Sequence, residues 1–155
     1  MKFATSPNTG TLVASLQIVK QKIIMKIKMA PKEFHLKIPS KPGVYKIYSL
    51  DKNNSPKALP RVLGIDKSGI LYIGKSENLK DRLRMLWRVL NPIMVAKAHT
   101  FGVNYNSLKL IQKSFPLQTL AVEFEERQNP KVYEKELLEK YRQKYGEVPP
   151  LNGSK

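Results

Sequence analysis

A change of hydrophobic period along the chain, from strand-like to helical, restricts the fold most strongly. Residues 43–50 (GVYKIYSL), 62–65 and 70–75 are rich in β-branched and aromatic side chains and predict three short strands. Residues 51–60 form a turn-rich loop, and Asp66 to Gly69 have the chemistry of a hairpin turn. We therefore expect a small sheet built from hairpins, which makes it mostly antiparallel.

Two amphipathic helical patterns follow these strands. The first begins after Asn78, a good N-cap residue, and its apolar stripe is formed by Leu79, Leu83, Leu86 and Leu90. The second begins at Asn129-Pro130 and ends at Gly146. Residues 105–115 predict a short helix and 117–124 a strand. The chain is therefore expected to have an α+β fold, with a sheet of three strands, or four, flanked by helices.

The first 42 residues differ from the rest of the chain. They are rich in lysine, contain four prolines and show little periodicity, which predicts a basic, partly flexible arm over 1–42 ahead of a folded domain over 43–155. Such an arm could follow DNA, since lysine neutralises phosphates without reading sequence. It could equally be a solvated tail, or upstream sequence from an over-long start assignment.

Composition narrows the class of protein further. Lysine and arginine number 28 against 12 acidic residues, a net charge of +16, which favours nucleic acid as a partner ahead of acidic membranes. The absence of cysteine excludes disulfides, thiol catalysis and cysteine-based zinc sites. No apolar run reaches the length of a membrane helix, so we expect no membrane partner and a cytoplasmic protein.

Two charged residues lie on or beside the apolar stripes of the helices. Glu134 shares the spacing of the buried stripe formed by Leu137, Leu138, Tyr141 and Tyr145. A carboxylate there is costly unless it is paired or holds a metal, although a structural ion pair near the helix start is an equally simple explanation. Arg82 flanks the first stripe, where it could present a planar fork to a phosphate or extend along the surface toward water.

Two tyrosine motifs lie in the predicted strands beside glycines. Gly43-Val44-Tyr45 begins the first strand, and Tyr72-Ile73-Gly74 lies in the third. Tyrosines in strands are usually packing residues, but a glycine inside a strand often marks the close approach of a ligand or of another backbone.

This set of motifs resembles the GIY-YIG nuclease family. The GVY at 43–45 and YIG at 72–74 are similar to the two half-motifs that name it. Lys75 follows the second half-motif, Arg82 lies where the family carries its catalytic arginine, and Glu134 precedes an apolar pair as the metal-binding glutamate does. Asn152 is similar to the asparagine that closes the domain. The resemblance covers residues 41–155.

The resemblance implies a GIY-YIG nuclease fold and a metal-dependent endonuclease that hydrolyses DNA, double-stranded or branched, to 5′-phosphate and 3′-hydroxyl ends. Glu134 would hold one Mg²⁺ (or Mn²⁺), which prefers oxygen ligands. Arg82 would stabilise the phosphate, and Tyr72 would activate water with help from Tyr45. Lowering the tyrosine pKa requires nearby cations, expected from Lys75, Arg82 and the metal. The expected substrate contacts are Gly74, Lys75, Arg84 and Asn152.

Some features depart from this family or leave alternatives open. The gap between the half-motifs is longer than usual, and Leu86 lies where some members place a histidine or tyrosine. His35 and His99 are too far apart to indicate a histidine metal motif. A non-cleaving nucleic-acid-binding module with the same fold, acting as a partner subunit, is the alternative function. The sequence identifies no element that reads DNA bases, so a protein partner could supply specificity, and it leaves the oligomeric state open.

Overall fold

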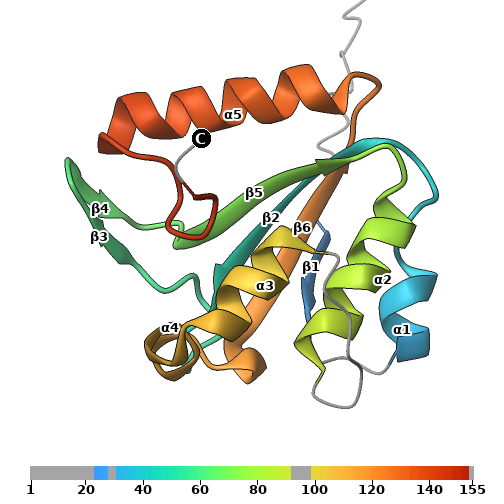
Figure 1. The fold of residues 1–155 in the computed structure, drawn as a ribbon, viewed down its shortest axis with the longest axis horizontal. Coiled ribbons are helices and arrows are strands. Elements are labelled where there is room, and N and C mark those ends of the chain that lie inside the picture. The colour runs from blue at the N-terminus through green and yellow to red at the C-terminus, as the bar shows by residue number, and fades with distance from the viewer. Residues whose placement is uncertain (1–22, 28–30, 92–98, 154–155) are drawn as a thin grey trace, which may run out of the picture.

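The computed structural model describes residues 23–27, 31–91 and 99–153 of the chain of 155 residues (Figure 1). Its helices and strands are, in order, β1 (Ile23–Lys26), α1 (Pro31–Leu36), β2 (Gly43–Ser49), β3 (Leu59–Arg61), β4 (Gly64–Asp66), β5 (Ile70–Ser76), α2 (Leu79–Leu90), α3 (Thr100–Ser107), α4 (Lys109–Ser114), the 3₁₀ turn η1 (Leu117–Thr119), β6 (Leu120–Glu126) and α5 (Pro130–Tyr145).

The described strands form a four-stranded sheet and a separate two-stranded hairpin. The main sheet has the order β1-β6-β2-β5, and each neighbouring pair is antiparallel. In β2, Tyr45 lies opposite Gly74 of β5 on one side and Phe124 of β6 on the other. The α+β class and the antiparallel sheet expected from the sequence are confirmed, and the sheet has four strands, the larger of the two numbers expected.

Helices cover both faces of this sheet (Figure 1). On one face, Tyr141 and Tyr145 of α5 pack against Ile73. The other face is covered by α1, α2 and α3 and holds the larger core, whose members include Phe34, Ile47, Leu83, Leu86 and Phe101. Because successive strand residues point to opposite faces, β5 directs Tyr72 into the large core and Ile73 toward α5.

The prediction that residues 1–42 form an arm is wrong for the part that the structure describes. The strand β1 pairs with β6 along four residues, and Ile27, Phe34 and Ile38 are buried in the large core. Burial of three large apolar side chains stabilises their attachment to the domain by removing them from water. The folded domain therefore includes residues 23–27 and 31–42, while residues 1–22 and 28–30 lie outside the described ones.

The strand predicted over residues 62–65 is only partly confirmed, because β4 covers Gly64–Asp66. Val62 and Leu63 form the turn between β3 and β4, which pair with each other and not with β5. These two residues are 70% and 61% exposed. Valine and leucine favour a strand by composition, but at these exposed turn positions burial does not determine the backbone conformation. The turn at Asp66 to Gly69 is present and leads from this hairpin into β5.

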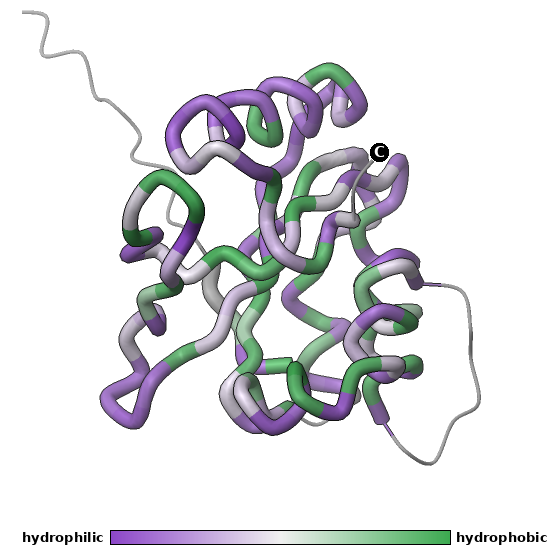
Figure 2. The backbone as a smooth tube through the Cα atoms, turned by 60° about the vertical axis from the view of Figure 1, so that its left-hand side comes forward, coloured by the Kyte–Doolittle hydropathy of each residue, from purple (hydrophilic) through white to green (hydrophobic). Residues whose placement is uncertain are grey.

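The two long helices match their predictions. Asn78 is the N-cap of α2, and Gly146 ends α5 in a left-handed conformation (φ 79°) that glycine adopts without strain. Figure 2 shows that α5, at the top of the view, is hydrophilic along much of its length. The single helix predicted over residues 105–115 is replaced by the end of α3 and by α4, and β6 begins at Leu120, after η1. No helix in the described ranges is long and apolar enough to cross a membrane.

Asp66 joins the start of β5 to the last turns of α5. Its carboxylate accepts hydrogen bonds from the backbone N–H groups of Ser68 (2.8 Å) and Ile70 (2.9 Å) and from the hydroxyls of Tyr141 (2.9 Å) and Tyr145 (3.3 Å). Burial acts to raise the pKa of Asp66, but the hydrogen bonds from Ser68, Ile70 and Tyr141 outweigh it and lower the pKa. The ionised carboxylate therefore fixes the helix relative to the strand.

Replacing Asp66 by asparagine should lower the free energy of unfolding by about 2–3 kcal/mol at pH 7, because hydrogen bonds to a buried charge are lost. The folded pKa lies below that of a free aspartate, so this stabilisation is complete above about pH 4 and declines as the pH falls further. Urea denaturation at pH 7 and pH 3 should show the gap between wild type and variant narrowing in acid. Asp51→Asn, in an exposed loop, is the matched control, and equal losses in both variants would contradict this role.

Candidate active site

Tyr45 and Tyr72 lie side by side in the large core, near its boundary with solvent. They come from the neighbouring strands β2 and β5 and point to the same face of the sheet. Their ring centroids are 6.1 Å apart. Tyr45 is 1% exposed and Tyr72 is 7% exposed, so Tyr72 is the tyrosine with more access to solvent. The two half-motifs are therefore brought together as the sequence predicts.

Gly74 provides the space that these two rings occupy. A Cβ atom at this position would lie 2.5 Å from the hydroxyl oxygen of Tyr45 and 2.7 Å from a ring carbon of Tyr72. Both distances are far below van der Waals contact. The structure thus gives Gly74 a steric role beneath the tyrosines, and its contact with substrate stays a prediction.

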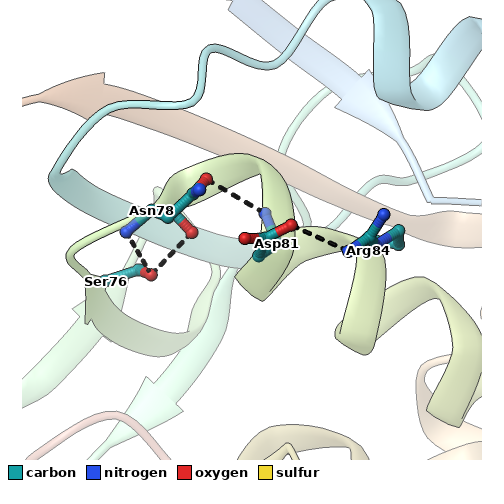
Figure 3. Close-up of polar contacts among 4 residues, drawn as sticks. All are labelled: Ser76, Asn78, Asp81 and Arg84. Carbon is teal, nitrogen blue, oxygen red and sulfur yellow. Dashed lines mark hydrogen bonds and ion pairs between the residues drawn. The ribbon is translucent and has the colours of Figure 1, made fainter.

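Arg82 lies on α2 and binds both hydroxyls. Its Nε donates to the Tyr45 oxygen at 3.3 Å, and a hydrogen bond also links it to Tyr72. Burial acts to lower the pKa of Arg82, but the two tyrosines outweigh it and raise the pKa. The helix that carries it is fixed at its start by Asn78, whose side chain accepts from the Asp81 N–H at 3.2 Å (Figure 3).

Arg84 is directed away from this cluster. It makes an exposed ion pair with Asp81, at 2.8 Å, one turn earlier on the same helix (Figure 3). Exposed ion pairs contribute little to stability, so Arg84 remains able to exchange Asp81 for another anion. The start of this helix is also held by Ser76, whose hydroxyl donates to the Asn78 carbonyl at 2.7 Å.

Both tyrosine hydroxyls are less acidic than that of a free tyrosine. Burial is the largest cause of the raised pKa at Tyr45, followed by Tyr72, while Arg82 acts in the opposite direction. Burial also raises the pKa of Tyr72, and the negative charge of Glu134 raises it further, whereas Arg82 and a hydrogen bond with Tyr45 lower it. The expected effect of Arg82 on acidity is present, but burial outweighs it, and both tyrosines are protonated at neutral pH.

Glu134 approaches from the other layer of the fold. It lies near the start of α5, is half-buried, and interacts electrostatically with Tyr72. Its stripe on α5 is the buried one, as predicted from the spacing, because Tyr141 and Tyr145 are buried and Leu137 and Leu138 pack beside them. A carboxylate, a guanidinium and two hydroxyls therefore meet near β5, the edge strand of the sheet.

His99 also belongs to this cluster, although no pattern in the sequence predicts it. Its side chain is 0% exposed, and its Nε2 lies 2.9 Å from the Tyr45 hydroxyl oxygen. Burial lowers the pKa of His99 to about 3, and the charge of Arg82 acts in the same direction, so the ring is neutral. His99 stands directly before α3, and nothing in its spacing from the tyrosine motifs indicates this contact, which depends on the packing of α3.

Asn152 and Lys75 lie outside the tyrosine cluster. The Asn152 side chain accepts from the Ile73 N–H at 2.9 Å and donates to the Ile73 carbonyl at 2.7 Å. These two bonds attach the C-terminal segment to the edge of β5, so Asn152 has a structural role, and its contact with substrate stays a prediction. Lys75 alternates with Gly74 along β5, so it shares the face of Ile73 and α5.

The structure is similar to solved structures of the GIY-YIG N-terminal endonuclease domain of UvrC from Thermotoga maritima. These are the magnesium-bound domain and two point mutants with a tyrosine replaced by phenylalanine, each bound to the catalytic divalent cation. The mutants cover 80% of this chain, the magnesium-bound domain 79%, and each match covers 96% of that chain at 22% identity and a TM-score of 0.38. No protein-family model and no curated protein matches this chain. At this degree of similarity, we base the proposed function on the side chains of this chain.

Replacing Asn152 by alanine should lower the free energy of unfolding by about 1–2 kcal/mol, because two hydrogen bonds to the edge of β5 are lost. Amide exchange at Ile73 should accelerate, as measured by NMR. Asn152→Asp should have an intermediate effect, since it can still accept from the Ile73 N–H but cannot donate to the carbonyl. A loss of DNA affinity with unchanged stability and exchange would instead support the substrate contact predicted from the sequence.

Proposed function

We propose that this protein is a metal-dependent endonuclease that hydrolyses phosphodiester bonds in DNA. The arrangement around Arg82 carries the proposal. Its guanidinium hydrogen-bonds to the hydroxyls of Tyr45 and Tyr72, and the carboxylate of Glu134 acts on Tyr72 from the opposing helix. A fixed cation for a phosphate, a hydroxyl for a water molecule and a carboxylate for a metal are the groups that phosphodiester hydrolysis requires.

The donor chemistry around Tyr72 fits one hard divalent cation. Glu134 contributes a half-buried carboxylate. Among the described residues, no group of three or more histidine, cysteine, aspartate or glutamate side chains could hold a metal. One carboxylate completed by water and phosphate oxygens is a set that Mg²⁺ accepts, since it keeps several waters, and Mn²⁺ takes similar ligands. Bound at Glu134, such an ion would supply Lewis-acid stabilisation of the phosphate and of the leaving oxygen.

The residues of the chain would divide the remaining work. Arg82 presents a planar set of N–H donors from which phosphate oxygens would accept hydrogen bonds, which offsets the negative charge that grows in the transition state. Tyr72, the more exposed tyrosine, would contact the attacking water, and the more deeply buried Tyr45 would orient Tyr72. Lys75 and Arg84 would contact phosphates on either side of the cluster.

The charge of the chain supports DNA, double-stranded or branched, as the substrate. A net charge of +16 attracts a polyanion irrespective of its sequence, and the binding should weaken steeply with salt. We infer that the choice of target comes from DNA structure or from a protein partner, since phosphate contacts carry no sequence information.

Glu134→Gln should reduce cleavage at least about 100-fold, because it removes the proposed metal ligand, while DNA binding should persist. The measurement is nicking of supercoiled plasmid with Mg²⁺ or Mn²⁺, with EDTA as a further control, alongside a gel-shift assay. Glu136→Gln changes an exposed carboxylate on the same helix and should leave the rate unchanged. A fully active Glu134→Gln variant would rule out this metal site.

Arg82→Ala should slow cleavage about 100- to 1000-fold, since a preorganised donor to the transition state is lost. Arg84→Ala, two residues along the same helix, should change the rate by no more than about threefold and mainly reduce the salt dependence of binding. Single-turnover rates at saturating protein separate the two effects. Equal losses in both variants would mean that the phosphate is held by the exposed side of α2.

A nucleic-acid-binding module that does not cut, acting as a partner subunit, is the second candidate. The raised pKa values of both tyrosines favour it, because protonated hydroxyls are poor bases. Salt-sensitive binding without cleavage of plasmid or branched DNA, in either metal, would establish this function in place of the first.

A further inference from the structure

His99 is a buried polar side chain beside the proposed catalytic tyrosines, and the roles assigned above leave it without a task. Its Nε2 is 2.9 Å from the Tyr45 hydroxyl oxygen, and its ring packs against Tyr45 and Tyr72 with centroids 5.8 Å and 6.1 Å away. An apolar side chain could fill this volume without the cost of burying polar atoms. The presence of a histidine here is therefore best explained by its hydrogen bond to Tyr45.

Tyr45 forms hydrogen bonds with Arg82 and Tyr72 as well as with His99. Arg82 has no acceptor, so its Nε–H donates to the Tyr45 oxygen. The Tyr72 ring lies beside that of Tyr45, and the two hydroxyls are in hydrogen-bond contact. A hydroxyl has one proton, so the direction of the bond to His99 decides whether this proton is left for Tyr72 or is used on the imidazole.

The other ring nitrogen of His99 decides this direction. Nδ1 is buried and has no hydrogen-bond partner among the described residues. A proton on Nδ1 would leave a buried N–H donor unpaired, which is rarer in proteins than an unpaired acceptor. The neutral ring should therefore carry its proton on Nε2, facing Tyr45.

We propose that His99 is a positioning residue of this site: its Nε2–H donates to the Tyr45 oxygen and thereby directs the Tyr45 hydroxyl proton to Tyr72. The inference rests on the proposed nuclease function and deepens it. Tyr72 then accepts hydrogen bonds from Tyr45 and Arg82 together, which orients its own hydroxyl proton away from the cluster. Donors linked in sequence strengthen one another, so the imidazole acts on Tyr72 through Tyr45.

The first test uses the intact protein without DNA. The chain has two histidines, so ¹⁵N NMR of the imidazoles can be assigned with the His35→Gln variant. His99 should be neutral and protonated on Nε2 at pH 7 and at pH 5, and Tyr45→Phe should shift its signals by removing the acceptor. A proton on Nδ1, a charged ring, or signals unchanged in Tyr45→Phe would overturn the proposal.

The second test compares two substitutions in single-turnover cleavage of supercoiled plasmid with Mg²⁺. His99→Leu removes the donor and should slow cleavage about 10- to 100-fold, whereas His99→Gln, whose amide can donate to Tyr45, should recover most of the rate. His35→Gln is the control and should behave as wild type. Equal slowing by leucine and glutamine, in variants with equal melting temperatures, would reduce His99 to a packing residue.

The two tests keep this inference separate from the proposed function. If the wild-type protein does not cleave DNA, the nuclease proposal fails, and the NMR result alone decides whether His99 holds Tyr45 in this orientation. If His99→Leu does not fold, the wild-type and Tyr45→Phe spectra still decide it.

Discussion

The antiparallel register between β2 and β5 is the constraint on which the candidate site depends. It places Tyr45 opposite Gly74 and Ile47 opposite Tyr72, so that both tyrosines point to one face and the glycine lies beneath their rings. A shift of one residue would turn Tyr45 toward α5 and expose or bury the wrong side chains along the whole strand. The large apolar core on one face, and the packing of α5 on the other, make such a shift costly.

Polar contacts outside the site hold the elements that supply its side chains. The Asn78 cap fixes the start of α2, which carries Arg82. The Asp66 carboxylate ties α5, which carries Glu134, to the turn before β5, and Asn152 holds the free edge of β5 beside Tyr72. Asn78 and Asp66 act where the backbone enters α2 or β5, whereas Asn152 bonds to Ile73 in the middle of β5. Arg82 and Glu134 are therefore supplied by helices on opposite faces of one sheet, and both act on Tyr72.

Local patterns were sufficient for the elements with strong periodicity and specific caps. The strands holding the two tyrosine motifs, both long helices and the buried stripe of α5 could be predicted, because burial and capping act on nearby residues. The core role of Phe34 could not, since lysines and prolines around it hide an apolar segment that packs only in the tertiary structure. Val62 and Leu63 gave the opposite error: they are residue types that favour strands, but they lie in an exposed turn. His99 and Asn152 act through contacts distant in sequence, which no spacing rule encodes.

The acidity of Tyr72 reflects a balance between burial and charge in which Glu134 and Arg82 oppose each other. Burial and the glutamate raise its pKa, while the guanidinium and the hydrogen bond with Tyr45 lower it. Since Tyr45 is more deeply buried and donates its own proton to Tyr72, it is the poorer candidate for a base, and the two tyrosines are not equivalent. Glu134 opposes proton loss from Tyr72 only while its negative charge is uncompensated. Any divalent cation that it held would reverse the sign of the charge beside Tyr72, so the proposed metal ligand is also the group through which the tyrosine would respond to the metal.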